Sequence, residues 1–554
     1  MSDPNRDLEI KLINYLENKQ YDRLQFEIEM MGDIETQENS LLVFYYASSI
    51  FLKENSKEKE LIFASNLLEK VYRKQNNHLK SLYNMIAISL KTRIFKDVMI
   101  LAEKELKKNE KDTMLIDGLA RINMYLANHN EGIKYFRSLF EILPEQLNGR
   151  LPFISSLNYA NDISQKEYLN ECFKYISVLE KKYKLEKNSL KIENQNKKKI
   201  KLSFLSADFK THSVTHFLKD LLEKIDRSNF EIVLISNLKI ADHDIVTEEL
   251  KKLADHWYDI VHYNDKNLVS FLRSLNLEIL IDLSGFTIGN RFEAIFNRCA
   301  KTQILWLGYN NTLGCKNIDY IISDKNLIKE NEISSYAEKI LFMPKIWNAL
   351  SPPDKLPDIK KNLNNSKFTF CSFNNFFKIT EKTIEVWSKI INQTNSNLLL
   401  KDSINGGEEL QSNIINKFLK HGVKSESLIF LQKEKEIYDH LKLYNEADAA
   451  LDTFPYPGVT TSYEAVLMGL PVLSMKGFNM NSRCGESINK NLGMDHLIAD
   501  DYEDYIKKAI MLAKDKNLKE NYGNNLRNKA LSSPLFDTDT FTKDFENILK
   551  KIYN

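Results

Sequence analysis

The stretch Leu451-Asp-Thr-Phe-Pro-Tyr-Pro-Gly-Val-Thr-Thr-Ser-Tyr-Glu-Ala465 contains the end of an apolar strand, a turn rich in Pro and Gly, and the start of an amphipathic helix near Thr460. This order of elements is typical of a parallel α/β sheet. Backbone N–H groups at a helix start are unpaired and partly positive, so they suit a phosphate. Thr460 and Thr461 add hydroxyl donors, and Glu464 could accept hydrogen bonds from ribose hydroxyls. An ordinary helix cap supplied by Thr is the alternative interpretation.

Short apolar strands alternate with amphipathic helices on both sides of this stretch. We predict a first series of strands at 201–206, 231–236, 278–283, 303–307, 320–323 and 339–343. A second series is predicted at 368–373, 398–401, 428–431, 449–452 and 472–475. The polar stretch 348–367 separates them, so the sequence predicts two parallel sheets with right-handed crossovers. Ligands of such sheets bind outside the carboxyl ends of the strands, so we expect the site between the two lobes.

The first 185 residues have apolar positions at helical spacing throughout. Two blocks repeat at the period of tetratricopeptide (TPR) helix pairs, and the second fits better, with Ala120, Gly132, Phe136, Leu139 and Pro144 at its characteristic positions. An irregular helical bundle is the alternative. We therefore expect a TPR-like helical domain at 1–185, a linker at 186–200, lobes at 201–350 and 366–535, and a C-terminal helix at 536–554.

Composition excludes several classes of protein. Across 554 residues, 77 Lys and Arg balance 76 Asp and Glu, so a net charge of +1 gives no reason to expect a nucleic-acid partner. The polar start does not fit a secretory signal, and no apolar run is long enough to span a bilayer. Five scattered Cys residues without a CxxC pair argue against disulfides and against a zinc site. We expect a cytoplasmic protein without a metal cofactor.

Two loops carry further candidates for chemistry. Lys378 lies just past the first strand of the second lobe, where its charge could meet a diphosphate. The loop Ser206-Ala-Asp-Phe-Lys-Thr-His-Ser-Val-Thr-His216 holds two His residues and an Asp, which suggests a base for an acceptor hydroxyl. A His that caps a helix is the alternative there.

Six segments occur in the order found in one known family. They are Phe204-Leu-Ser-Ala-Asp-Phe209, Asp282-Leu-Ser-Gly-Phe-Thr287, Ile304-Leu-Trp-Leu-Gly-Tyr309, Ile318-Asp-Tyr320, Ser372-Phe-Asn-Asn375 and Leu451-Asp-Thr-Phe-Pro-Tyr456. Over about residues 200–535 the chain thereby resembles the catalytic region of protein O-GlcNAc transferases and their SPINDLY-type relatives. The resemblance implies a metal-independent, inverting GT-B enzyme that moves a sugar, by preference GlcNAc from UDP-GlcNAc, to Ser or Thr of proteins.

The resemblance also implies roles for single residues. His212 matches a candidate catalytic base, His256 a second active-site His, and Lys378 the diphosphate-binding Lys. The remaining matches concern the nucleotide sugar: backbone contacts to the sugar at Leu307 and Gly308, a neighbouring side chain at Asn375, a base-stacking ring at His440, diphosphate contacts at Thr460 and Thr461, and a ribose contact at Glu464. Val459 and Leu443 depart from the animal enzymes, where a His and a base-contacting Arg occupy these places.

Three readings of the function stay open. In the first, the chain is a Ser/Thr glycosyltransferase, and its TPR-like helical domain (the arm) presents protein acceptors. The donor would be UDP-GlcNAc or, as in SPINDLY-type relatives, GDP-fucose. The lobes could instead serve one glycan or one dedicated partner, such as a flagellar protein. Outside the enzyme class, the chain could be a non-catalytic TPR scaffold.

Overall fold

A computed structural model describes residues 4–75, 77–183, 199–360, 367–401, 407–515 and 517–553. The chain forms two compact units, one of residues 1–144 with 405–414 and the other of residues 145–404 with 415–554. Of the predicted linker 186–200, residues 186–198 lie outside the described residues.

The first unit is helical. Its helices are α1 (Pro4–Glu17), α2 (Tyr21–Glu29), α3 (Ser40–Leu52), α4 (Glu58–Lys74), α5 (Leu79–Thr92), α6 (Lys96–Leu106), α7 (Thr113–Tyr125) and α8 (His129–Ile142). The helices α7 and α8 approach closely at Gly132, where an added Cβ would lie 2.8 Å from the Met124 sulfur and 3.1 Å from the Ala120 carbonyl oxygen. The small residues of the better-fitting repeat block therefore lie at this helix–helix contact.

Two further helices, α9 (Arg150–Ser156) and α10 (Gln165–Tyr183), belong to the second unit. The hydroxyl of Tyr168 on α10 is hydrogen-bonded to that of Tyr309, and the Asn158 amide donates to Tyr309 over 3.2 Å. The helical region that we predicted at 1–185 is thus divided between the units at Pro144.

The first lobe is a seven-stranded parallel sheet of order β3-β2-β1-β4-β5-β6-β7. Its strands are β1 (Ile200–Ser206), β2 (Phe230–Ser236), β3 (His256–Asp259), β4 (Ile279–Asp282), β5 (Thr302–Leu305), β6 (Tyr320–Asp324) and β7 (Lys339–Met343). The helices along it are α11 (Ser213–Lys224), α12 (Ile245–Leu253), α13 (Asp265–Ser274) and α14 (Phe292–Ile295). Six strands were predicted, whereas β3 at the sheet edge was missed.

The second lobe is a six-stranded parallel sheet of order β10-β9-β8-β11-β12-β13. Its strands are β8 (Thr369–Ser372), β9 (Asn397–Lys401), β10 (Leu428–Leu431), β11 (Ala449–Leu451), β12 (Val472–Met475) and β13 (Ile498–Ala499). Its helices are α15 (Glu381–Thr394), α16 (Gly407–Lys420), α17 (Ile437–Lys442), α18 (Thr460–Leu467), α19 (Cys484–Asn491), α20 (Tyr502–Lys514), α21 (Leu518–Asn521) and α22 (Gly523–Leu531). Five of the six strands match predicted ones, which confirms the prediction of two Rossmann-like lobes.

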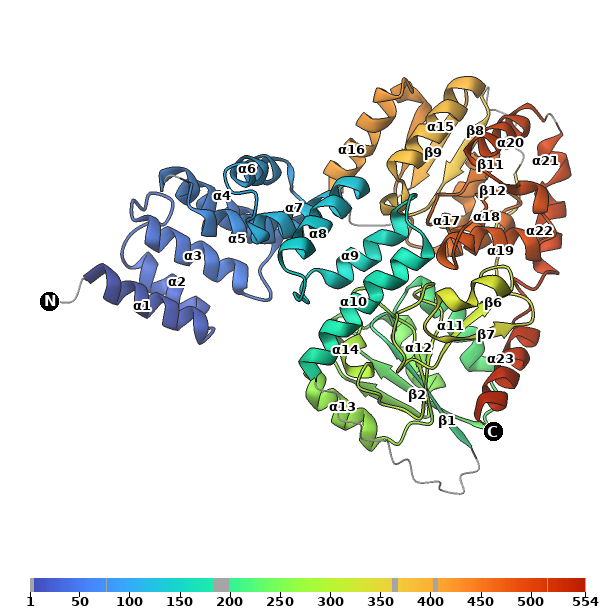
Figure 1. Ribbon diagram of the computed structural model, residues 1–554. Coiled ribbons are helices and arrows are strands. Elements are labelled where there is room, and N and C mark those ends of the chain that lie inside the picture. The colour runs from blue at the N-terminus through green and yellow to red at the C-terminus, as the bar shows by residue number, and fades with distance from the viewer. Residues whose placement is uncertain are drawn as a thin grey trace. The chain divides into compact units, whose positions relative to one another are not determined.

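The C-terminal helix α23 (Thr538–Tyr553) packs on the first lobe, beside α11 and β7 (Figure 1). The ring of Phe545 lies 4.8 Å from that of Trp306, and the Glu546 carboxylate accepts a hydrogen bond of 2.8 Å from the Asp226 backbone N–H. Burial of such aromatic rings stabilises the packing of α23 on the first lobe.

Candidate functional site

The strand order of the second sheet reverses direction between β8 and β11. Chains leave the carboxyl ends of these two strands in opposite directions, which opens a crevice where ligands of parallel sheets bind. Lys378 follows β8, and Asp452 follows β11. The Asp452 carboxylate accepts hydrogen bonds from Gly458 N–H over 2.7 Å and from the Ser474 hydroxyl over 3.0 Å. These bonds hold the Pro- and Gly-rich loop against the sheet edge.

Lys378 lies at this crevice without a carboxylate partner among the described residues. Its Nζ donates to the Pro457 carbonyl oxygen over 2.8 Å and lies 4.2 Å from the centroid of the Tyr456 ring. Burial lowers the pKa of the Lys378 ammonium to about 8, and the nearby Asp452 charge acts in the opposite direction. An ammonium group held in this way carries charge that is available to an anionic ligand.

Helix α18 begins with Thr460, directly after the loop, and its first turn has no side-chain cap. Val459 occupies the N-cap position, so the alternative of an ordinary Thr cap is wrong. The backbone N–H groups of Thr460 and Thr461 donate to none of the described residues. The Thr461 hydroxyl donates to the Asn374 side-chain oxygen over 2.9 Å. Free amides at the start of a helix form a ready site for a phosphate.

One turn further along α18, Glu464 meets His440 of α17. The His440 Nε2 and the Tyr444 hydroxyl each lie 2.9 Å from the same carboxylate oxygen, Oε2. Burial would raise the pKa of Glu464, but the hydrogen bond and charge of His440, with Tyr444 and Lys401, lower it. The other oxygen, Oε1, has no hydrogen-bond partner among the described residues, so it can accept one from a ligand hydroxyl.

The two asparagines that end the Ser372-Phe-Asn-Asn375 segment have different surroundings. Asn375 accepts a hydrogen bond of 2.9 Å from the Phe377 N–H and so caps its own turn. Asn374 is buried and joins Thr461 to Asp452, to which its amide donates over 3.2 Å. The family resemblance of the sequence pointed to Asn375 as a neighbour of the nucleotide sugar. In the structure it is Asn374 that is hydrogen-bonded to Thr461 at the start of α18.

The first lobe meets this site through α11. The ring of Phe217 on α11 lies 5.4 Å from that of Tyr463 on α18, so the two helices pack together. His216, the residue before Phe217, lies close enough to Glu464 for their charges to interact. Burial by the surrounding protein lowers the pKa of His216, although its side chain remains accessible to solvent. A neutral imidazole in this place can accept a proton.

His212 caps α11, as the alternative interpretation of this loop predicted. Its Nδ1 accepts a hydrogen bond of 3.3 Å from the Val214 N–H and lies 4.0 Å from an Asp208 carboxylate oxygen. Because Nδ1 accepts, a neutral His212 ring carries its proton on Nε2 and offers a donor to the solvent. Of the two His residues that the sequence offers as a base in this loop, His212 has its Nδ1 engaged in the helix cap, and His216 is the other candidate.

His256 is not brought to this site. It is the first residue of β3, so it lies toward the amino ends of the parallel strands, and its Nε2 is 3.1 Å from the Glu231 carboxylate. At the carboxyl edge of the first sheet, the Nε2 of His243 instead lies 3.5 Å from a carboxylate oxygen of Asp259.

Leu307 and Gly308 form a tight turn after β5. Leu307 has a φ of +79°, a left-handed conformation that is uncommon outside glycine. A Cβ on Gly308 would lie 1.9 Å from the Leu283 carbonyl oxygen, so only glycine fits there. Backbone strain of this kind gathers at ligand sites, and the turn lies at the carboxyl edge of the first sheet.

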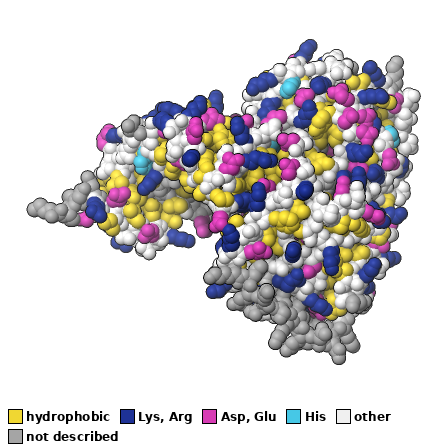
Figure 2. All heavy atoms as spheres, viewed as in Figure 1, with side chains coloured by type: hydrophobic (Ala, Val, Ile, Leu, Met, Phe, Trp, Pro, Cys, Tyr) yellow, Lys and Arg dark blue, Asp and Glu magenta, His cyan; other side chains and the backbone are white. Residues whose placement is uncertain are grey.

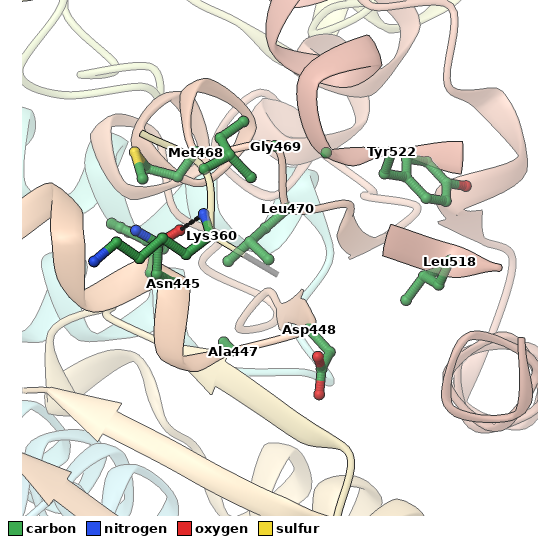
Figure 3. A pocket seen from close by; sticks show the side chains of 12 residues that line it. Lys360, Asn445, Ala447, Asp448, Met468, Gly469, Leu470, Leu518 and Tyr522 are labelled. Carbon is green, nitrogen blue, oxygen red and sulfur yellow. Dashed lines mark hydrogen bonds between the residues drawn. The ribbon is translucent and has the colours of Figure 1, made fainter. Parts of the chain in front are cut away.

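The pocket in Figure 3 lies elsewhere. It is lined by Lys360, Asn445, Asp448, Leu470 and Tyr522 among others, and Asp448 and Leu470 come just before β11 and β12. It therefore opens at the amino edge of the second sheet, away from Lys378 and α18.

Within the described ranges, no helix is long and apolar enough to cross a membrane, and no group of three or more His, Cys, Asp or Glu side chains could hold a metal ion. On the face in Figure 2, basic and acidic side chains are interspersed, in keeping with the net charge of +1.

The chain is similar in sequence to known glycosyltransferases. The chain is 30% identical over 357 residues to a probable UDP-N-acetylglucosamine--peptide N-acetylglucosaminyltransferase SPINDLY of Solanum lycopersicum, covering 64% of this chain and 38% of that one. It is 26% identical over 369 residues to the probable transferase SEC of Arabidopsis thaliana, covering 64% and 37% of the two chains. The chain thus spans less than two fifths of the length of these curated relatives.

A solved O-GlcNAc transferase mutant of Thermobaculum terrenum has the same fold. It matches with a TM-score of 0.79 and 22% identity, covering 94% of this chain and 98% of that one. The two lobes therefore have the GT-B fold. The sequence model of glycosyl transferase family 41 matches residues 136–350 and 357–545, and the chain belongs to that family.

Proposed function

We propose that this protein is an inverting, metal-independent glycosyltransferase that moves a sugar from a nucleotide sugar to Ser or Thr hydroxyls of proteins. The observation that carries the proposal is that Lys378, which has no carboxylate partner among the described residues, shares one sheet edge with the uncapped start of α18. Together they supply an ammonium and free backbone amides to a diphosphate. The names of the relatives support UDP-GlcNAc as the donor.

In the proposed reaction the acceptor oxygen attacks the anomeric carbon, and the bond from that carbon to the diphosphate oxygen breaks. The diphosphate leaves with the electron pair, and its growing charge is met by Lys378 and the amides of Thr460 and Thr461. The hydroxyl proton passes to a base, for which the accessible, neutral His216 is the best placed group. His212, with its Nε2 proton, would orient the acceptor rather than deprotonate it.

The sugar would lie against the turn at Leu307 and Gly308, which packs closely on the Leu283 carbonyl oxygen. Ribose hydroxyls would donate to the free oxygen of Glu464, beside the ring of His440. Positioning of the two reactants and stabilisation of charge supply most of the rate in such a site. The helical unit would contribute to binding of the protein acceptor, since stacked helices commonly offer such surfaces.

Calorimetric titration with UDP, GDP, UDP-GlcNAc and GDP-fucose tests the donor, with chelator present throughout to test metal independence. We expect UDP to bind more tightly than GDP, and Lys378→Ala to weaken that binding at least about tenfold, because a charged hydrogen bond is lost. Lys417→Ala is the matched control, since Lys417 is also largely buried but pairs with Glu381. A preference for GDP would assign a fucosyl-type donor. If the folded protein binds none of these four compounds, the enzyme proposal is wrong, and the non-catalytic TPR scaffold is the remaining interpretation.

Transfer is tested with labelled donor and a set of Ser- and Thr-containing proteins, read by mass spectrometry. Labelling of many proteins supports a general protein transferase, whereas labelling of one indicates a dedicated partner.

A further inference from the structure

Lys401 is a nearly buried lysine at the carboxyl end of β9 that no motif pointed to. Its side chain is 5% exposed, and its Nζ is hydrogen-bonded to the Nδ1 of His440. The ammonium also lies 5.5 Å from the centroid of the Phe373 ring. Lys401 thus shares the sheet edge with Lys378, but it contacts a different group.

The hydrogen bond from Lys401 favours the same tautomer of His440 as the Glu464 carboxylate does. A charged lysine can only donate, so Nδ1 must accept. A neutral imidazole that accepts at Nδ1 bears its proton on Nε2, and this nitrogen is 2.9 Å from Oε2 of Glu464. The three side chains form one directed chain of hydrogen bonds, from Lys401 through His440 to Glu464.

This chain fixes the orientation of the Glu464 carboxylate. Oε2 receives His440 Nε2–H, and it is the nearer acceptor of the Tyr444 hydroxyl at 2.9 Å, compared with 3.3 Å for the Thr461 carbonyl oxygen. Oε1 remains for a ligand. The positive charge of Lys401 and the negative charge of Glu464 lie on either side of the imidazole, so the arrangement is balanced electrically while largely excluded from solvent.

We propose that Lys401 is a positioning residue for recognition of the nucleoside half of the donor. It holds His440 in the Nε2–H tautomer and thereby holds Glu464 with one oxygen free for a ribose hydroxyl. The inference rests on the proposed function, because it assigns the nucleoside to this end of the site. Lys378 and α18 take the diphosphate, so the two lysines divide the donor between them.

The test is Lys401→Met in the full chain, which keeps the length of the side chain and removes its charge and donors. We expect the affinity for UDP, or for GDP if wild type prefers it, to fall at least about tenfold, as when a buried hydrogen-bond partner is removed. Binding of inorganic pyrophosphate, which has no nucleoside, should stay within about twofold by the same measure. Lys401→Arg should restore most of the nucleotide affinity, since Arg is also a pure donor.

The tautomer is read directly from the nitrogen NMR spectrum of protein labelled at histidine, with His440→Gln used to assign the signal. Wild type should show His440 unprotonated at Nδ1, and Lys401→Met should lose this preference. Lys417→Met, a matched change of a largely buried lysine elsewhere in the same unit, should alter neither signal nor affinity.

Three results would overturn the inference. An equal loss of pyrophosphate binding in Lys401→Met would make Lys401 a phosphate contact. Unchanged nucleotide affinity, or an unchanged His440 signal, would show that Lys401 does not position the pair. Wild type that binds pyrophosphate but neither nucleotide would instead contradict the proposed function, while the NMR result would still report on the tautomer.

Discussion

Lys378 makes nucleotide binding depend on pH. Burial lowers the pKa of its ammonium to about 8, so the group is charged below this pH and neutral above it. Because a diphosphate needs the charged form, we expect affinity to fall by up to about tenfold per unit as the pH rises above about 8. Calorimetric titrations with UDP and GDP at a series of pH values from neutral upward measure this.

Lys378→Arg provides the control for this pH dependence, since a guanidinium stays charged across the whole range. Its affinity should remain flat even if it is lower than that of wild type. An equal fall in the variant and in wild type would place the titrating group elsewhere.

His216 offers a second prediction on a single side chain. If its neutral ring accepts the acceptor proton, His216→Gln should lower kcat by about a hundredfold and leave KM nearly unchanged. Transfer of labelled sugar to whichever acceptor the first assay identifies gives both constants.

The comparison variant for His216 is His212→Asn, because Asn also caps helices well and keeps α11 intact. We expect a smaller loss of kcat in this variant. The opposite ranking, with His212→Asn the more damaged of the two, would assign the base to His212.

The function of a single residue could be predicted from the sequence where it depends only on the place of that residue next to one strand or helix. Lys378 and the Thr460 helix start were found because each lies in or after the loop that leaves the carboxyl end of a strand. Lys401 and Asn374 were missed, and the choice between His212 and His216 stayed open, since these roles depend on which residues of other strands and helices contact them. Spacing along one segment carries no information about such contacts between elements.

At the scale of elements, the turn after β5 depends on Gly308. A Cβ there would approach the Leu283 carbonyl oxygen to 1.9 Å, so β4 and the turn would have to move apart. We expect Gly308→Ala to lower the free energy of unfolding by about 1–3 kcal/mol, and to weaken binding of the nucleotide sugar more than binding of the nucleotide. Denaturant titration and calorimetry measure the two effects.

Gly422→Ala is a suitable control for that change. Gly422 has a φ of +76° and only a distant neighbour at 3.8 Å, so Ala there costs about 1 kcal/mol of backbone strain without a clash. Equal sugar-nucleotide affinity in Gly308→Ala and wild type would contradict a role of this turn in holding the sugar.

The strands that sequence patterns revealed are those with continuous apolar runs. The missed strands are β3, which is four residues long and reads His-Trp-Tyr-Asp, and β13, which has two residues. Both lie at the edges of their sheets, where one side pairs with no strand and polar residues are tolerated. Short polar edge strands give no periodicity to detect.

At the scale of the whole molecule, the second unit comprises all of residues 145–554 except 405–414, so we expect the fragment 145–554 to fold without the first eight helices. We expect this fragment to bind UDP or GDP within about threefold of the full chain, since both lobes and α9–α10 are retained. Transfer to protein acceptors should fall much further. Loss of cooperative unfolding in the fragment would show that the arm is required for folding.

The alternation of strands and helices gave the two-lobe architecture, and six short segments gave the family. The boundary of the arm could not be found in this way, because α9 and α10 have the same helical spacing as the repeats before them. Their membership in the second unit depends on buried contacts such as that between Tyr168 and Tyr309, which a helical pattern does not encode.

The uncapped start of α18 has a consequence for engineering. Val459→Asp would offer a carboxylate to the free amides of the helix, and a good N-cap stabilises a protein by about 0.5–2 kcal/mol. The same carboxylate would occupy those amides and repel a diphosphate. A library of variants selected only for resistance to heat would therefore accumulate changes at this position that abolish turnover, so any such selection has to include a screen for sugar transfer.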